Sequence, residues 1–152
     1  MFRFFCFFCL IGLLCACTSG PKPPAVDDQT DSNLTLIKNL YAAANRHDWP
    51  EVASYYSNPT RFLEPSMGAD YHPVLHEEII ARYVSLEEAY SNFRMEIVGI
   101  YPYRNTVTVE YVSTGAEITG HLWKLPMCSV FTLKDGKIVQ EAVYYNQSGG
   151  GR

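Results

Sequence analysis

The chain has 152 residues, enough for one domain with a single hydrophobic core and too few for two well-packed domains. Its content of 47% hydrophobic, 18% charged and 14% aromatic residues excludes a disordered chain, a collagen-like repeat and a coiled coil. The formal net charge is -4, and the Lys and Arg residues are scattered, so we expect no nucleic-acid partner.

The N-terminal residues have the layout of a secretory signal. Arg3 precedes an apolar run from Phe4 to Leu14, which is short for a transmembrane span. The segment Leu14-Cys15-Ala16-Cys17 resembles a bacterial lipobox. This resemblance implies that residues 1–16 are removed and that Cys17 carries lipid, with an acyl chain such as palmitate on the new amino terminus, at the periplasmic face of the outer membrane. An uncleaved membrane anchor with a free Cys17 thiol is the alternative.

The rest of the chain divides into a linker, one domain and a tail. Residues 17–31 form the lipidated cysteine and a linker rich in Pro and Asp, which we expect to be flexible. The domain covers residues 32–147, and residues 148–152 form a Gly-rich tail. All eleven tyrosines follow residue 16, a composition that suits a pocket. Cys128 has no partner cysteine within the domain and is expected to be a small buried residue.

Two helices are predicted at the start of the domain. Apolar residues at positions 34, 37, 40, 41 and 44 form one stripe, on a helix that begins at Ser32 or Asn33 and ends near His47. Asp48-Trp49-Pro50-Glu51 has the form of a capping box. It predicts a second, short helix that runs to about Tyr56.

A short strand and a third helix follow. Arg61 to Glu64 alternates like a strand and leads into a turn at Pro65 to Gly68. Pro73 is predicted to open the third helix, with Glu77 and Glu78 near its positive end.

From residue 92 onwards the hydrophobic period is two, which predicts antiparallel strands. These strands cover residues 93–97, 106–111, 128–133 and 138–145, with a separate short strand at 121–125 that Pro126 ends. Lys134-Asp135-Gly136-Lys137 predicts a tight hairpin. Helices first and strands afterwards indicate an α+β fold, with three N-terminal helices packed against a curved antiparallel sheet.

Three segments resemble SnoaL-like domains of the nuclear transport factor 2-like (NTF2-like) superfamily. They are LYAAANRHDW at Leu40 to Trp49, RFLEP at Arg61 to Pro65 and VFTLKDGKIVQEAVYYN at Val130 to Asn146. The resemblance covers about residues 34 to 146 and implies a cone whose sheet curls around an apolar cavity, often a homodimer through the outer sheet face. The same cone hosts isomerases, cyclases, hydratases, dehydratases and members without known chemistry.

Glu64 is the tentative catalytic residue. The resemblance extends to ketosteroid isomerase, whose general base is an acid before a proline, and Glu64 stands at the matching position. Strand alternation places Glu64 on the same face as Phe62. Burial beside an aromatic ring would raise its pKa towards neutrality, as a proton shuttle needs. Alternatively, Glu64 pairs with Arg61 or bonds to the following turn.

Other isomerase positions differ in this chain. Leu40, next to Tyr41, stands where the isomerase has a helix-one tyrosine, and Ser129 stands where it has the aspartic acid of the oxyanion hole. The loss of both donors argues against steroid isomerisation. His121 and Trp123 share a strand face and are predicted at the cavity mouth. The expected ligand contacts are therefore Tyr41, Phe62, Ser129, Phe131, His121 and Trp123.

The remaining polar candidates are assigned to other roles. Glu110, Glu141 and Tyr145 are expected on the outer sheet face or in cross-strand pairs. His47 is expected to face solvent. His72 and His76 are four residues apart without a supporting third ligand, so we expect neither a metal nor a cofactor.

The sequence leaves two classes of function open. One is an envelope-tethered binder of a small apolar molecule, with acid–base chemistry of the isomerase, cyclase or hydratase type. The other is a non-catalytic envelope module that dimerises or binds a protein through its sheet face. An open cavity of roughly a few hundred Å³ would favour the first class.

Overall fold

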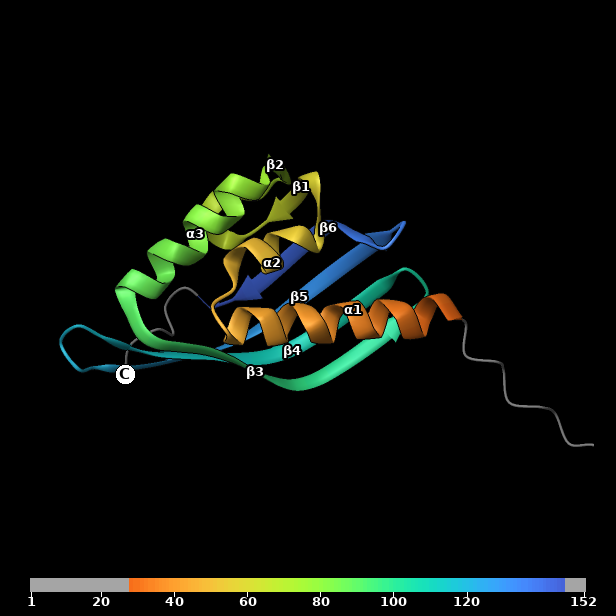
Figure 1. Cartoon of the computed structure of the whole chain (residues 1–152). Coiled ribbons are helices and arrows are strands. Elements are labelled where there is room, and N and C mark those ends of the chain that lie inside the picture. Colours follow the sequence, from red (N-terminus) through yellow and green to blue (C-terminus); the bar gives the residue numbers. More distant parts are fainter. Residues whose placement is uncertain (1–27, 147–152) are drawn as a thin grey trace, which may run out of the picture.

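The computed structural model describes residues 28–146 (Figure 1). The predicted signal peptide, the lipidation site at Cys17 and the tail lie outside the described residues. The elements in chain order are α1 (Asp28–Asn45), α2 (Trp49–Ser54), β1 (Tyr56–Leu63), a 3-10 turn η1 (Pro65–Met67), β2 (His72–Val74), α3 (His76–Ala89), β3 (Tyr90–Tyr103), β4 (Thr106–Glu117), β5 (Leu122–Lys134) and β6 (Lys137–Tyr145). No helix in this range is long and apolar enough to cross a membrane.

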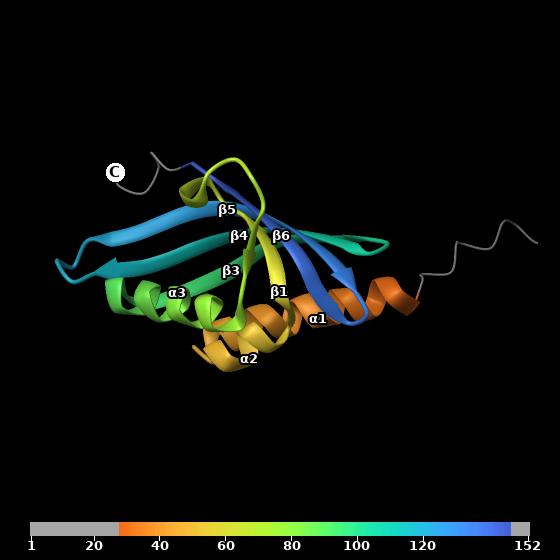
Figure 2. The same cartoon turned by 90° about the horizontal axis from the view of Figure 1, so that it is seen from above.

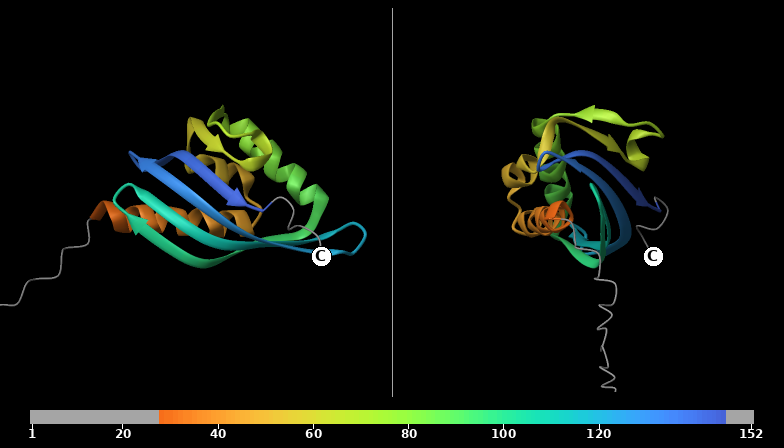
Figure 3. Two further views of the ribbon diagram at one scale, coloured as in Figure 1. Left: turned by 180° about the vertical axis from the view of Figure 1, so that it is seen from behind. Right: turned by 90° about the vertical axis from the view of Figure 1, so that its right-hand side faces the viewer.

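The six strands form one curved sheet in the order β2-β1-β6-β5-β4-β3. Seen end on and from above, the sheet curls and the three helices gather on one side of it (Figures 2 and 3). The α+β cone predicted from the sequence is confirmed. The sheet is mixed, however, because β1 runs parallel to β6, whereas the other neighbouring strands are antiparallel.

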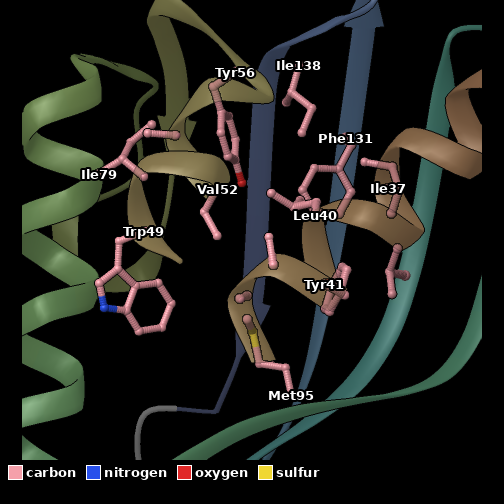
Figure 4. Close-up of a cluster of buried hydrophobic side chains, with 14 of the residues drawn as sticks. Ile37, Leu40, Tyr41, Trp49, Val52, Tyr56, Ile79, Met95, Phe131 and Ile138 are labelled. Carbon is pink, nitrogen blue, oxygen red and sulfur yellow. The ribbon is translucent and has the colours of Figure 1, made fainter. Parts of the chain in front are cut away.

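The core lies between the helices and the concave face of the sheet (Figure 4). Helix α1 contributes Ile37 and Leu40, and the sheet contributes Val109 and Phe131, all buried. Asn33 is also buried, and its side-chain amide donates to the Arg104 carbonyl at 3.0 Å. Helix α1 begins at Asp28, earlier than the predicted Ser32 or Asn33, and Asn33 ties the helix to the β3–β4 turn instead of capping it.

Two prolines were assigned wrongly from the sequence. Pro73 lies in β2, opposite Arg61, and α3 begins only at His76. Because β2 is the edge of the sheet, the missing N–H of a proline is tolerated there.

Pro126 does not end a strand, since β5 runs through it opposite Val112. Pairing of β5 with β6 ends at Met127, so at Pro126 the strand has only one neighbour and loses no bond to β6.

Two local predictions are confirmed. The Asp48 carboxylate accepts a hydrogen bond from the Glu51 backbone N–H at 3.0 Å and caps α2, which ends at Ser54. The hairpin between β5 and β6 turns at Asp135 and Gly136, with φ of 52° and 71°. Positive φ at both central residues is the geometry that matches the twist of a two-residue hairpin.

Candidate functional site

A cavity of about 400 Å³ lies between α3 and the concave face of the sheet. Its lining comes from β1 to β6 and from one side of α3, and it is mostly apolar and aromatic. The charged residues that line it, among those the structure describes, are Glu64, Arg82 and Glu141. Pockets of this size and composition are typical small-molecule sites.

Glu64 lines this cavity together with Phe62, as strand alternation predicts. Its side chain is only 12% exposed and forms an ion pair with Arg82 of α3. It also accepts hydrogen bonds from the Tyr145 hydroxyl at 3.0 Å and the Ser66 hydroxyl at 2.7 Å. A guanidinium and two hydroxyl donors favour the ionised carboxylate. Glu64 therefore has a polar environment on one side, although it lines an apolar cavity.

Of the two partners expected for Glu64 in the alternative interpretation, the following turn does bond to it, through Ser66, but Arg61 lies elsewhere. Its exposed guanidinium sits 4.9 Å from the centre of the Tyr71 ring. The ion pair of Glu64 is therefore made by a helix that crosses the cavity, not by a neighbour on the same strand.

Glu141 is a second acid in the cavity. Of its two predicted placements, the outer sheet face is wrong, whereas hydrogen bonding to neighbouring strands is found. Glu141 is 5% exposed and accepts hydrogen bonds from the Tyr56 hydroxyl at 2.7 Å and the Ser129 hydroxyl at 2.9 Å. The Tyr111 hydroxyl lies 3.2 Å from Ser129 and extends this network. Burial raises the pKa of Glu141, and the two hydroxyl donors and the more distant Arg82 offset this effect only in part.

An irregularity in β6 explains why Glu141 was missed. Leu133 pairs with Ile138, but the preceding Thr132 pairs with Gln140, so Val139 is an extra residue in the strand. In a regular strand every second residue faces inwards, so counting from the buried Ile138 would place Glu141 on the outer face. The extra residue Val139 shifts this alternation by one position, and the side chains of Glu141 and the alternate residues after it face inwards instead.

The same reversal brings Tyr145 inside, so its predicted place on the outer face is also wrong. Glu110, by contrast, is exposed on the outer face of β4 and accepts a hydrogen bond from Tyr101 at 3.2 Å. That placement agrees with the prediction.

The predicted ligand contacts separate into three groups. Phe62 and Trp123 line the cavity, and Trp123 stacks on Tyr90 with ring centres 4.9 Å apart. Tyr41, Ser129 and Phe131 lie behind the cavity in the core, where Ser129 holds Glu141 and Tyr41 packs edge-on against Tyr111 at 5.2 Å. His121 is exposed at the β4–β5 turn and does not line the cavity, so its predicted role there is wrong.

His47 does not face solvent freely, as had been expected. Its Nδ1 lies 2.8 Å from the Glu87 carboxylate and its Nε2 lies 2.9 Å from the Phe93 carbonyl. The Trp49 indole also donates to Glu87 at 2.8 Å and stacks on Tyr83 at 4.9 Å. Since Tyr83 and Phe93 line the cavity, this cluster supports the cavity wall from outside.

Within residues 28–146 no group of three or more His, Cys, Asp or Glu side chains could hold a metal ion. His76 contacts the Tyr56 carbonyl at 3.0 Å, and His72 lies in β2. Neither histidine lines the cavity.

The arrangement of a curled sheet, three helices and an apolar cavity matches one family model, described as a SnoaL-like domain, over residues 37–141. The chain belongs to the SnoaL-like family. No curated protein matches it.

Solved structures show the same fold at low sequence identity. A hypothetical protein with a ketosteroid isomerase-like fold from Catenulispora acidiphila, in complex with trimethylamine, has 16% identity, a TM-score of 0.67 and coverage of 76% of this chain and 88% of its own. A putative SnoaL-like polyketide cyclase from Jannaschia sp. has 17% identity, a TM-score of 0.68 and coverage of 80% and 90%. SalBIII, described as epoxide hydrolase/cyclase-like, has 16% identity, a TM-score of 0.69 and coverage of 80% and 95%.

Proposed function

We propose that this SnoaL-like protein binds a small, largely apolar molecule in its cavity and transfers protons on it, with Glu141 as the acid and Glu64 as the base. The observation that carries the proposal is the presence of two carboxyl groups in opposite environments within one apolar cavity. We further propose that lipid on Cys17 holds this domain at the cell envelope.

The two environments suit the two roles. Burial favours the neutral, proton-donating form of Glu141, whereas Arg82 favours the ionised, proton-accepting form of Glu64. Divergent environments of paired acids are the usual basis of an acid–base assignment. Phe62 is opposite Glu141 in the β1–β6 register, and Glu64 follows two residues later on the same face, so one ligand can reach both groups.

The reaction type that we favour is ring formation or hydration. Two structural neighbours are described as a polyketide cyclase and as an epoxide hydrolase/cyclase-like enzyme in pyran ring formation. Leu40 lacks a hydroxyl, and the Ser129 hydroxyl donates to Glu141, so neither residue supplies the oxyanion donor that steroid isomerisation requires.

The test uses anthrone, a neutral tricyclic ketone whose methylene protons exchange through its enol. Binding should change the fluorescence of Trp123, and Trp123→Phe should remove that change while Trp49 still emits. The protein should accelerate deuterium exchange at the methylene, followed by NMR. Glu64→Gln and Glu141→Gln should each slow this exchange by about a hundredfold.

Glu110→Gln is the matched control, because it makes the same change on the outer face of the sheet. Binding without faster exchange would contradict the chemistry and leave only a binder. No binding of anthrone or of any co-purifying molecule in native mass spectra would favour the non-catalytic envelope module.

A further inference from the structure

The cavity has an unbalanced set of charges. Of the three charged residues that line it within residues 28–146, Arg82 is paired with Glu64. The hydrogen-bond partners of Glu141 are the neutral hydroxyls of Tyr56 and Ser129. When Glu141 is ionised, the lining therefore carries one net negative charge. A buried carboxylate without a cation beside it is costly, and a positively charged ligand would remove that cost.

Aromatic rings surround this carboxyl group. Phe62 lies opposite Glu141 on the neighbouring strand, and the lining also includes Tyr83 from α3 and Tyr111 from β4. Tyr83, Tyr111 and Glu141 also line one small void in the core, which places the three groups close together. Aromatic faces attract alkylammonium groups, whose methyl groups also suit an apolar pocket.

We propose that the ligand of this cavity is an organic ammonium ion with an apolar body, and that the Glu141 carboxylate holds the ammonium among Phe62, Tyr83 and Tyr111. This inference rests on the proposed function in one respect, namely that the cavity binds a small molecule. It does not use the proposed proton transfer by Glu141, because a Glu141 carboxylate that holds an ammonium ion has already lost its proton. It adds the chemical class of that molecule.

At a pH below the raised pKa of Glu141, binding of a cation must be coupled to loss of the Glu141 proton. In the free protein, burial raises the pKa of Glu141 and favours its neutral form. A ligand that arrives as a free amine takes the proton on its nitrogen, whereas a ligand that is already cationic releases the proton to solvent. The other titratable or charged groups around Glu141 are Glu64, Arg82, Tyr41, Tyr56, Tyr83 and Tyr111. The pKa values of these four tyrosines are raised, so the tyrosines remain neutral.

The test compares two probes of the same shape, benzyltrimethylammonium and its uncharged carbon analogue neopentylbenzene. Calorimetric titration of the full chain should give an affinity about tenfold or more higher for the cation. Titration in buffers of different ionisation heat should show proton release with the cation alone. Affinity for the cation should rise with pH until Glu141 is ionised in the free protein.

Variants identify the residue responsible. Glu141→Gln should abolish the preference for the cation and retain binding of neopentylbenzene, while Glu110→Gln should behave like the wild type. Should Glu141→Gln fail to fold, Phe62→Leu provides a second test, because loss of the ring should weaken binding of the cation by about fivefold and change that of neopentylbenzene little.

Equal affinity for the two probes, or a preference for the cation that survives in Glu141→Gln, would overturn the inference. In both cases neopentylbenzene would still bind and the cavity would remain a ligand site. If neither probe binds, the inference is overturned, and if anthrone also fails to bind, the proposed function is overturned with it.

Discussion

The environment of each acid decides its chemistry, although Glu64 and Glu141 are the same residue type in the same cavity. Glu64 is joined to a guanidinium from α3, and Glu141 is joined only to hydroxyls. Desolvation therefore acts on Glu141 with little compensation from opposite charge.

Replacement of Glu141 by Gln should change the pH dependence of stability. The folded state binds the Glu141 proton more tightly than the unfolded state, whose pKa is near the ordinary value of 4.5. Wild-type stability must therefore fall as the pH rises from that value through the raised pKa of the folded state. Gln does not titrate, so Glu141→Gln should gain relative to wild type from about pH 4 to about pH 8, as measured by urea unfolding.

A difference between Glu141→Gln and wild type that stayed constant with pH would contradict this reading of Glu141. The control is Glu110→Gln, whose carboxylate lies on the exposed outer face of the sheet.

Replacement of Glu87 by Gln should have the opposite pH signature. Hydrogen bonds from Trp49 and then His47 lower the pKa of Glu87 in the folded state. Its contribution to stability is thus present above the unfolded pKa and is lost as the pH falls through the folded pKa. Glu87→Gln should reduce the thermal midpoint at about pH 7, and this deficit should shrink below about pH 4.

The neighbouring exposed residue offers a control for this prediction. Glu88→Gln makes the same change one residue along α3 and should leave the thermal midpoint nearly unchanged. Equal effects of the two substitutions would show that the cluster around His47 adds no specific stability.

At the scale of single elements, Gly115 in β4 controls one end of the cavity. A Cβ atom added there would lie 2.9 Å from the Cβ atom of Tyr90, which stacks on Trp123. Gly115→Ala should therefore displace Tyr90, reduce the free energy of unfolding by about 1–3 kcal/mol and alter Trp123 fluorescence.

Gly99→Ala is the matched control on β3. A Cβ atom at Gly99 would meet only the far end of the Tyr101 side chain, which is exposed and can swing away. If both substitutions had the same small effect, the Tyr90–Trp123 stack would not depend on Gly115.

At the scale of the whole molecule, the start of α1 and the β4–β5 turn lie at opposite ends (Figure 1). Trp123, which lines the cavity, follows that turn closely in β5. A tether that precedes α1 would therefore leave the domain at the end remote from the Tyr90–Trp123 stack.

The proposed anchor depends on the Cys17 thiol. Cys17→Ser removes the thiol that carries the diacylglycerol, so processing should stop and unprocessed precursor should accumulate. Two or three acyl chains anchor stably where one does not, so loss of this modification removes the proposed attachment. Mass spectrometry of membrane fractions measures both length and acylation. Mature-length, acylated protein in the variant would refute the lipobox assignment.

The homodimer that the family resemblance implies depends on the outer sheet face. Val107 and Tyr111 are buried on the inner face of β4. Val112 of β4, opposite Pro126, and Val130 of β5, opposite Thr108, are half-buried on the outer face. We expect a dimer at about micromolar concentration, and Val130→Lys should shift it towards monomer because a charge would enter the apolar contact. Sedimentation of the wild type as a monomer would contradict the dimer.

Local patterns in the sequence were sufficient for the three helices, for most of the strands and for the family, although β2 was missed and β5 was predicted as two strands. The stripe of α1, the Asp48 cap and the Asp135-Gly136 turn each depend on residues close together in the chain, so their consequences can be read without the fold. Glu64 and Phe62 share a face for the same reason, because alternation holds along the end of β1.

Tertiary structure alone decided the site. Glu141 and Tyr145 face inwards because the pairing of β6 with β5 creates a bulge at Val139, and no feature of the isolated strand marks that shift. Glu64 meets Arg82 because α3 crosses the cavity, which brings together side chains 18 positions apart in the sequence. Ion pairing and burial depend on residues that are distant in the sequence. Ion pairing with Arg82 favours the ionised form of Glu64, and burial favours the neutral form of Glu141.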